Sequence, residues 1–398
     1  MSALFKSKQT GVVLTGADDY PIHQVGLPIR HVGTSDRHFY DRYYFTGHGF
    51  GVKGTTDGPG EDGAFLSCGF GQYPNLGVQD AFFCIVEGRK HRALRASRHL
   101  DDRMNTAVGP IRVEVIEPLR RLRIIVDDNS SGVRADLEYT ATIPAYLEPR
   151  HFIREHARVL IDTERYSQVG HWRGTIETPD RVLTLEPETW NAYRDHSWGV
   201  RPVGEPEPGG IREDDGHQSQ LRLSGMWNYS TMQFDDFAIL YMLHETNEGV
   251  RHMQEGVRIW KDPDRDIEEL GEPIVHHDFV SGTRTVAGSL IEFPEAPGGG
   301  FEIKVLPLKR CYLSVGTGYG VEDDWRHGKY MGPAWFDVIE RNLDDLDSWA
   351  HMLYVENLAR FEIIGGRFGS SVGHGFHETG WIGPYEKLGF MTDKDVAP

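Results

Sequence analysis

Residues 111–139 read IRVEVIEPLRRLRIIVDDNSSGVRADLEY and carry the clearest structural pattern in the chain. Apolar and charged side chains alternate over 111–116, and again over 133–139 after the polar cluster 127–132. Alternation with a period of two is typical of a strand with one buried and one solvated face, and clusters of Asp, Asn, Ser and Gly favour turns. Short strands separated by frequent turns predict an antiparallel sandwich or barrel.

The same pattern extends through the second half of the chain. Further strand candidates are residues 226–234, 237–244, 257–260, 283–293, 301–306 and 358–364. The 46 glycines and 21 prolines mostly stand singly between short apolar runs, which is typical of proteins with many turns. The sequence therefore predicts an all-β protein built from antiparallel strands.

The length of the chain predicts more than one domain. A chain of 398 residues is too long for one ordinary hydrophobic core and suits two domains. Residues 202–216 are rich in Pro, Gly and Glu, as expected of a linker or a long surface loop. We expect an entry segment at 1–60 that packs on the first barrel, a first domain at 61–205 and a second domain at 206–398.

Charge and cysteine content exclude several classes of function. A net charge of −18 repels nucleic acid and anionic membranes. No apolar stretch approaches the ~20 residues of a membrane span, and residues 1–16 lack the apolar segment of a signal peptide. Three cysteines without CxxC spacing disfavour a disulfide framework and a thiolate zinc site. We expect a cytoplasmic protein, monomeric or homodimeric, that acts on a small apolar or amphipathic molecule.

The most distinctive segment is 191–199, NAYRDHSWG, which follows a strand. At a strand end or bulge, the side chains of Asp195 and His196 can approach one cavity. An apolar cavity raises the pKa of a carboxyl group, so that Asp195 can hold and donate a proton near neutral pH. His196 can position that carboxyl group or act as a base, and Trp198 can form a wall of the pocket. The alternative is structural: an Asp bonded to loop amides, a buried His and a core Trp.

Residues 193–199, YRDHSWG, resemble the hallmark of the hydroxyneurosporene synthase family. That family includes the carotenoid 1,2-hydratases, and a related group resembles the fungal decalin-forming Diels–Alderases. Residues 373–378 and 383–390 are similar to the end of uncharacterised members. The likeness runs from about residue 65 to the C-terminus, although only these two motifs are specific. It implies two lipocalin-like antiparallel β-barrel or sandwich domains, with a ligand cavity at or near their interface.

In the hydratases, the resemblance implies protonation of an isolated alkene by an acidic residue, followed by addition of water. It implies that Asp195 and His196 form the acid pair and that Trp198 is the aromatic neighbour. Tyr193 stands where many relatives have Trp, and Arg194 places a charge beside the pair. Both residues favour a substrate that is smaller or more polar than a carotenoid, such as one with a carboxylate or carbonyl group.

Other motifs do not predict a metal or a cofactor. His276 and His277 are consecutive, and His374 and His377 are three apart, so on strands each pair faces opposite ways. Residues 316–320, GTGYG, are followed by acidic residues that would repel phosphate. The sequence therefore predicts neither a metal site nor a bound cofactor.

We expect a cofactor-independent acid–base enzyme: a hydratase or other lyase, an isomerase or a cyclase. Its substrate would be an apolar, terpenoid-like or polycyclic small molecule. Asp195 would be the general acid and His196 its partner, while the substrate would contact the side chains of Tyr193, Arg194, Trp198, Trp227 and Trp260. The alternative is a carrier that binds a hydrophobic metabolite without catalysis.

Overall fold

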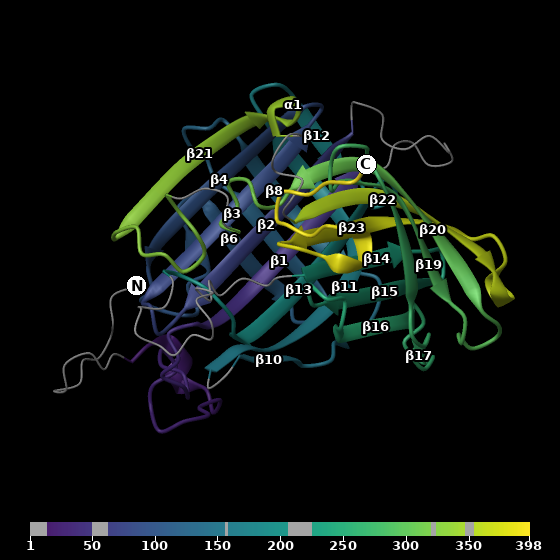
Figure 1. The fold of residues 1–398 in the computed structure, drawn as a ribbon. Coiled ribbons are helices and arrows are strands. Elements are labelled where there is room, and N and C mark those ends of the chain that lie inside the picture. Colours follow the sequence, from purple (N-terminus) through teal and green to yellow (C-terminus); the bar gives the residue numbers. More distant parts are fainter. Residues whose placement is uncertain (1–13, 50–62, 156–157, 206–224, 320–323, 347–353) are drawn as a thin grey trace.

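The computed structural model describes residues 14–49, 63–155, 158–205, 225–319, 324–346 and 354–398. Within these ranges almost all regular structure is β, arranged in two curled antiparallel sheets (Figure 1). The prediction of an all-β, two-domain lipocalin-like fold is confirmed. No helix in these ranges has the length and apolar character that crossing a membrane requires.

The first sheet has 14 strands, and its main path runs β21-β4-β3-β2-β1-β13-β11-β8-β7-β6-β5, with β9, β10 and β12 also paired to β11. Its strands are β1 (Phe39–Gly49), β2 (Ala64–Tyr73), β3 (Val78–Glu87), β4 (Lys90–His99), β5 (Ala107–Val108), β6 (Ile111–Glu117), β7 (Arg121–Val126), β8 (Arg134–Ala141), β9 (Tyr146–Leu147), β10 (His151–Glu155), β11 (Arg158–Glu177), β12 (Val182–Leu185), β13 (Trp190–Val200) and β21 (Ala334–Asn342).

The second sheet has nine strands in the order β17-β16-β15-β14-β23-β22-β20-β19-β18. Its strands are β14 (Gly225–Gln233), β15 (Phe237–Glu245), β16 (Arg251–Trp260), β17 (Glu268–Glu269), β18 (Ile274–Phe279), β19 (Val286–Phe293), β20 (Phe301–Tyr312), β22 (Val355–Gly365) and β23 (Val372–Ile382). The short helices are α1 (Leu343–Leu346) and the 3-10 turns η1 (Gly16–Asp19), η3 (Gly366–Phe368) and η4 (Glu386–Leu388).

Two connections differ from a simple division of the chain into halves. β1, which lies within the expected entry segment, is an internal strand between β2 and β13. β21 follows the second-sheet strand β20 in sequence but pairs with β4 at the edge of the first sheet. Most of the expected linker, 206–216, lies outside the described residues, so the domain boundary stays a prediction.

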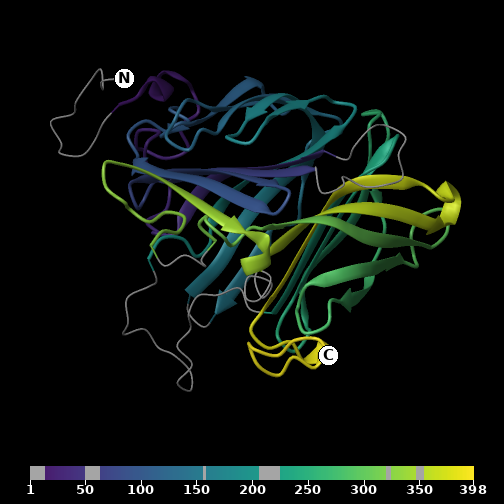
Figure 2. The same ribbon diagram turned by 90° about the horizontal axis from the view of Figure 1, so that it is seen from above.

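Several strands of the first sheet are buried on both faces. Along β3, Phe83 and Ile85 pack into a core enclosed by the first sheet itself. The alternate residues Phe82, Cys84 and Val86 belong to a second core, which also contains residues of the other sheet. The sequence of a strand that is buried on both faces is a nearly continuous run of apolar residues, because neither face contacts water. Residues of both sheets thus form one shared core, and Figure 2 shows the two curled sheets side by side.

Candidate functional site

The site is built around β13, which lies between β1 and β11 without a register break. Asp195 is paired with Tyr44 on β1 and Ser167 on β11. The next residue, His196, is paired with Tyr43 and Tyr166. Because successive side chains on a regular strand point to opposite faces, these two rows of side chains lie on opposite sides of the sheet.

The structure does not bring Asp195 and His196 together as an acid pair. His196 Nε2 lies 2.7 Å from an oxygen of Asp41, and its Nδ1 lies 3.2 Å from the hydroxyl of Tyr166. The expectation required a bulge or strand end at this point, and β13 has neither. Arg194 and Trp198 share the His196 face, where Arg194 donates to Gln168.

Asp195 faces the core that the two sheets share, and its side chain begins a chain of neighbouring polar groups between them. The hydroxyl of Tyr193 donates to Asp195 Oδ2 at 3.0 Å. It lies 3.1 Å from the hydroxyl of Tyr229, a residue of β14 in the second sheet. Tyr229 in turn donates to Glu148 Oε1 at 2.9 Å. All four side chains are buried, so the chain crosses the sheet interface away from solvent.

An ion pair holds one end of this chain. Arg165 Nε donates to Glu148 Oε2 at 2.7 Å, and Ser167 donates to the other carboxylate oxygen. The Arg165 guanidinium also lies over the rings of Tyr229 and Trp227, with Cζ 4.7 and 5.7 Å from their centroids. The expected pocket residue Trp227 therefore does lie beside the Asp195 face, and its ring stacks on Tyr229 with an interplanar angle of 4°.

The second sheet adds two carboxyl groups. Glu378 on β23 is paired with Tyr229 on one side and with Glu356 of β22 on the other. Glu356 is fully buried, and it accepts a hydrogen bond from Tyr44 of the first sheet. Its second oxygen has no hydrogen-bond partner among the described residues. A buried carboxylate with an unpaired oxygen is costly, so the neutral form of Glu356 is favoured.

Asp195, Glu356 and Glu378 all have raised pKa values. Burial raises the pKa of Asp195, while the positive charge of Arg165 opposes that effect. Burial, followed by the charge of Glu378, raises the pKa of Glu356 well above its usual range. Burial raises the pKa of Glu378 to about 7. The interface therefore contains carboxyl groups that can carry a proton near neutral pH, as general acids must.

The raised pKa of Glu378 predicts a specific pH dependence of stability. A carboxyl group whose pKa is higher in the folded than in the unfolded state stabilises the fold at low pH, and this contribution is lost as the pH rises from about 4.5 to about 7. Relative to Glu378→Gln, the wild-type free energy of unfolding should fall by about 1–3 kcal/mol between about pH 5 and pH 8. Denaturant titrations of the wild type and of Glu378→Gln at each pH measure this difference. Contributions from the histidines cancel, because both proteins contain the same histidines.

The exposed Glu302 of β20 provides the matched control, because Glu302→Gln should leave the pH dependence as it is in the wild type. A constant difference between wild type and Glu378→Gln from pH 5 to pH 8 would contradict the raised pKa.

A second unsatisfied group lies on the same face as Asp195. Arg42 stands two residues before Tyr44 on β1 and is 2% exposed. None of its three guanidinium nitrogens has a hydrogen-bond partner among the described residues. Its Cζ lies 4.7 Å from the ring centroid of Tyr319, so an aromatic face is its main contact. A buried guanidinium without hydrogen bonds is an available site for an anionic or carbonyl oxygen.

Replacing Arg42 with Met should not destabilise the ligand-free protein. The substitution removes a buried charge whose burial is not offset by any hydrogen bond to a described residue, so the stability should stay the same or rise. Thermal unfolding of wild type and Arg42→Met without ligand tests this expectation. A clear loss of stability in the variant would show that the guanidinium already has a partner.

Of the seven residues expected at the site, Tyr193, Asp195 and Trp227 lie together. Trp260 instead packs in the core of the second sheet against Phe237. The sequence did not point to Arg42, Glu148, Arg165, Glu356 or Glu378 as site residues. The segment that contains Glu378 is one of the two family-like motifs, which is the one signal that could have drawn attention to it.

The sequence matches the profile of a family of unknown function, DUF8625, over residues 14–391. The chain belongs to this family. No curated protein matches it. Among solved structures, the DUF8625 chain is similar to a candidate AttH protein from Nitrosomonas europaea, with 12% identity and a TM-score of 0.52 over 94% of this chain and 99% of the other. This likeness shows the fold alone.

A kievitone hydratase from Nectria haematococca is more distant from the DUF8625 chain. It has 10% identity and a TM-score of 0.43, over 88% of this chain and 93% of the other. That similarity is too weak to assign a function.

Proposed function

We propose that this DUF8625 protein is a cofactor-independent acid–base enzyme: a hydratase or other lyase, an isomerase or a cyclase. The observation that carries the proposal is the set of carboxyl groups with raised pKa values between the two sheets, of which Asp195 and Glu356 are buried and Glu378 is half-buried. Perturbed pKa values gather at catalytic sites, because a general acid must keep its proton near the operating pH.

In this proposal, Asp195 donates a proton to an unsaturated carbon of the substrate. The hydroxyl of Tyr193, at 3.0 Å, holds the carboxyl group in place. Glu378, with a pKa of about 7, accepts the proton that the attacking water or the cationic intermediate loses. Two carboxyl groups in different surroundings can thus divide the acid and base roles. His196 has no part in this scheme, because it lies on the other face of β13.

The proposed substrate is a mainly apolar small molecule with one anionic or carbonyl group. The stacked rings of Trp227 and Tyr229 offer apolar surface beside Asp195. The unpaired guanidinium of Arg42 supplies hydrogen-bond donors on the same face of the sheet. A terpenoid or polycyclic acid meets both requirements, and the resemblance to the hydroxyneurosporene synthase family agrees with a substrate of this kind.

The test is transfer of solvent hydrogen. The wild-type protein is incubated in D₂O with a panel of unsaturated terpenoid and polycyclic compounds, half of them carboxylic acids, and the products are analysed by mass spectrometry. We expect one or more acids to gain deuterium only when the protein is present. Binding of panel compounds, seen as a rise in melting temperature, without deuterium uptake by any of them would favour the carrier and contradict the enzyme.

A further inference from the structure

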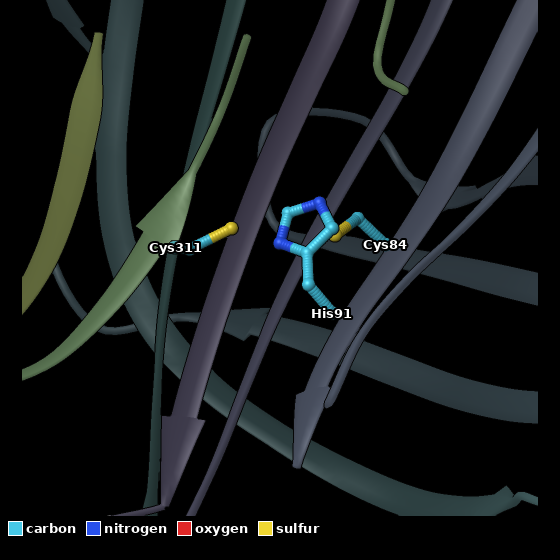
Figure 3. Close-up of side chains that lie close together, drawn as sticks. All are labelled: Cys84, His91 and Cys311. Atoms are coloured by element: carbon cyan, nitrogen blue, oxygen red, sulfur yellow. The ribbon is translucent and has the colours of Figure 1, made fainter. Parts of the chain in front are cut away.

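Three side chains that could bind a metal meet in the shared core. Cys84, His91 and Cys311 are all fully buried, and their sulfur and nitrogen donor atoms lie within 4.8 Å of one another. Figure 3 shows the imidazole ring of His91 with one ring nitrogen turned towards the sulfur of Cys311. This cluster has no role in the proposed proton transfer, and it uses different residues.

The cluster joins the two sheets. Cys84 lies on β3 and His91 on the neighbouring strand β4, where His91 is paired with Val86. The two side chains are therefore diagonal neighbours on one face of this hairpin. Cys311 comes from β20 of the second sheet. A ligand held by all three side chains would connect the sheets through bonds that the apolar core does not provide.

The surroundings of His91 favour metal binding. Its Nε2 lies 3.0 Å from the carbonyl oxygen of Val315, to which an N–H group can donate. Its Nδ1 is buried and has no hydrogen-bond partner among the described residues. If Nε2 carries the proton, the lone pair of Nδ1 is free. Histidine ligands of metals typically show this arrangement, in which the second ring nitrogen donates to a carbonyl or carboxylate oxygen.

We propose that Cys84, His91 and Cys311 bind a zinc ion. Zinc lies about 2.3 Å from sulfur and about 2.0 Å from nitrogen ligands, which separates tetrahedral donors by about 3.5–3.8 Å. One donor atom from each of the three side chains already lies within 4.8 Å of the other two. Small side-chain movements can therefore complete a site with three protein ligands and a water molecule in the fourth position.

The charge balance also favours zinc. Each cysteine binds as a thiolate and releases its proton to solvent, so that two thiolates, a neutral imidazole and Zn²⁺ together carry no net charge. Copper(I) also prefers soft sulfur ligands, but it would leave one negative charge in a core formed largely by apolar side chains. A neutral complex is the less costly one to bury.

The experiment titrates the reduced, full-length protein with Co²⁺ and then with Zn²⁺ in the absence of oxygen. We expect one Co²⁺ per chain with sulfur-to-cobalt charge-transfer absorption, displacement of that ion by one Zn²⁺, and a rise in melting temperature with zinc. Cys84→Ser and Cys311→Ser should each abolish the absorption. Cys68→Ser is the matched control, because Cys68 is equally buried but belongs to the core within the first sheet.

Three results would overturn the proposal. The first is the absence of cobalt absorption in the wild type, and the second is binding of copper(I) by a protein that does not bind zinc. The third is a Cys84–Cys311 disulfide that is present in protein isolated under air and, after reduction, forms again even when zinc is present. Competition for zinc between the wild-type protein and a chromogenic chelator measures the zinc affinity of the protein, and it needs no variant. It therefore tests the site even if the serine variants fold poorly.

Discussion

Replacing Asp195 with Asn should reduce deuterium transfer from solvent to substrate by about 10²- to 10⁴-fold, the usual contribution of one positioned proton donor. Asparagine keeps the size of the side chain and can still accept the hydrogen bond from Tyr193, but it has no acidic proton. The fold and substrate affinity should change little. The measurement is the rate of deuterium uptake, together with the substrate-induced shift in melting temperature.

The matched control is His196→Gln on the same strand. His196 bonds to Asp41 on the opposite face of the sheet, so its replacement should change the rate far less than Asp195→Asn does. Equal losses of deuterium-transfer rate in the two variants would indicate that Asp195 and His196 act as a pair, which would contradict the site described above. Full activity in Asp195→Asn would exclude this residue as the acid.

Replacing Arg165 with Met should lower the free energy of unfolding by about 3 kcal/mol, because it leaves the buried carboxylate of Glu148 without its ion-pair partner. The Arg165 side chain is 22% exposed and that of Glu148 only 4%. Most of the cost therefore comes from the unpaired acid. Chemical denaturation of the variant and the wild type measures the difference.

Two further variants separate this explanation from general damage to the core. The double variant Glu148→Gln/Arg165→Met removes the unpaired charge and should recover part of the lost stability. Arg134→Met breaks an exposed ion pair with Asp128 and should change the stability far less than Arg165→Met does. Equal losses in the single and double variants would show that Arg165 acts through packing and not through its charge.

The fold class could be predicted from sequence because each strand carries a local signal. Residues 111–139 form β6, β7 and β8 in a continuous antiparallel run, as the alternation and the turn at 127–132 predict. β1 is harder to recognise. This strand runs through the candidate site, and both of its faces contact polar groups. Its sequence therefore includes Asp41, Arg42 and His48 and lacks a clear apolar pattern. The pairing of β21 with β4 joins residues about 240 positions apart, which local patterns do not encode.

The site could be predicted only in part. The segment 193–199 drew attention to Asp195, but the partner of Asp195 depends on whether β13 is regular. A regular strand places Tyr193, two residues away, beside Asp195 and turns His196 to the other face. Glu148 and Glu378 come from distant segments that the packing of two sheets brings together.

The cysteine cluster was missed for a similar reason. Cys84 and His91 are seven residues apart across a hairpin, a spacing that matches no metal motif. Cys311 is more than 200 residues further along the chain. Sequence spacing identifies metal sites when the ligands lie on one local element, whereas here the ligands lie on strands of both sheets.

The proposed chemistry depends on a carboxyl group between the sheets whose pKa lies near neutral pH. The most direct test is a pH titration of the Glu378 side chain by NMR, with ¹³C-labelled glutamate carboxyl groups and Glu378→Gln to assign the resonance. We expect a midpoint within about one unit of pH 7. A midpoint near the ordinary glutamate value of about 4.3 would contradict the proposal, because Glu378 would then be too weak a base to hold the proton it accepts near neutral pH.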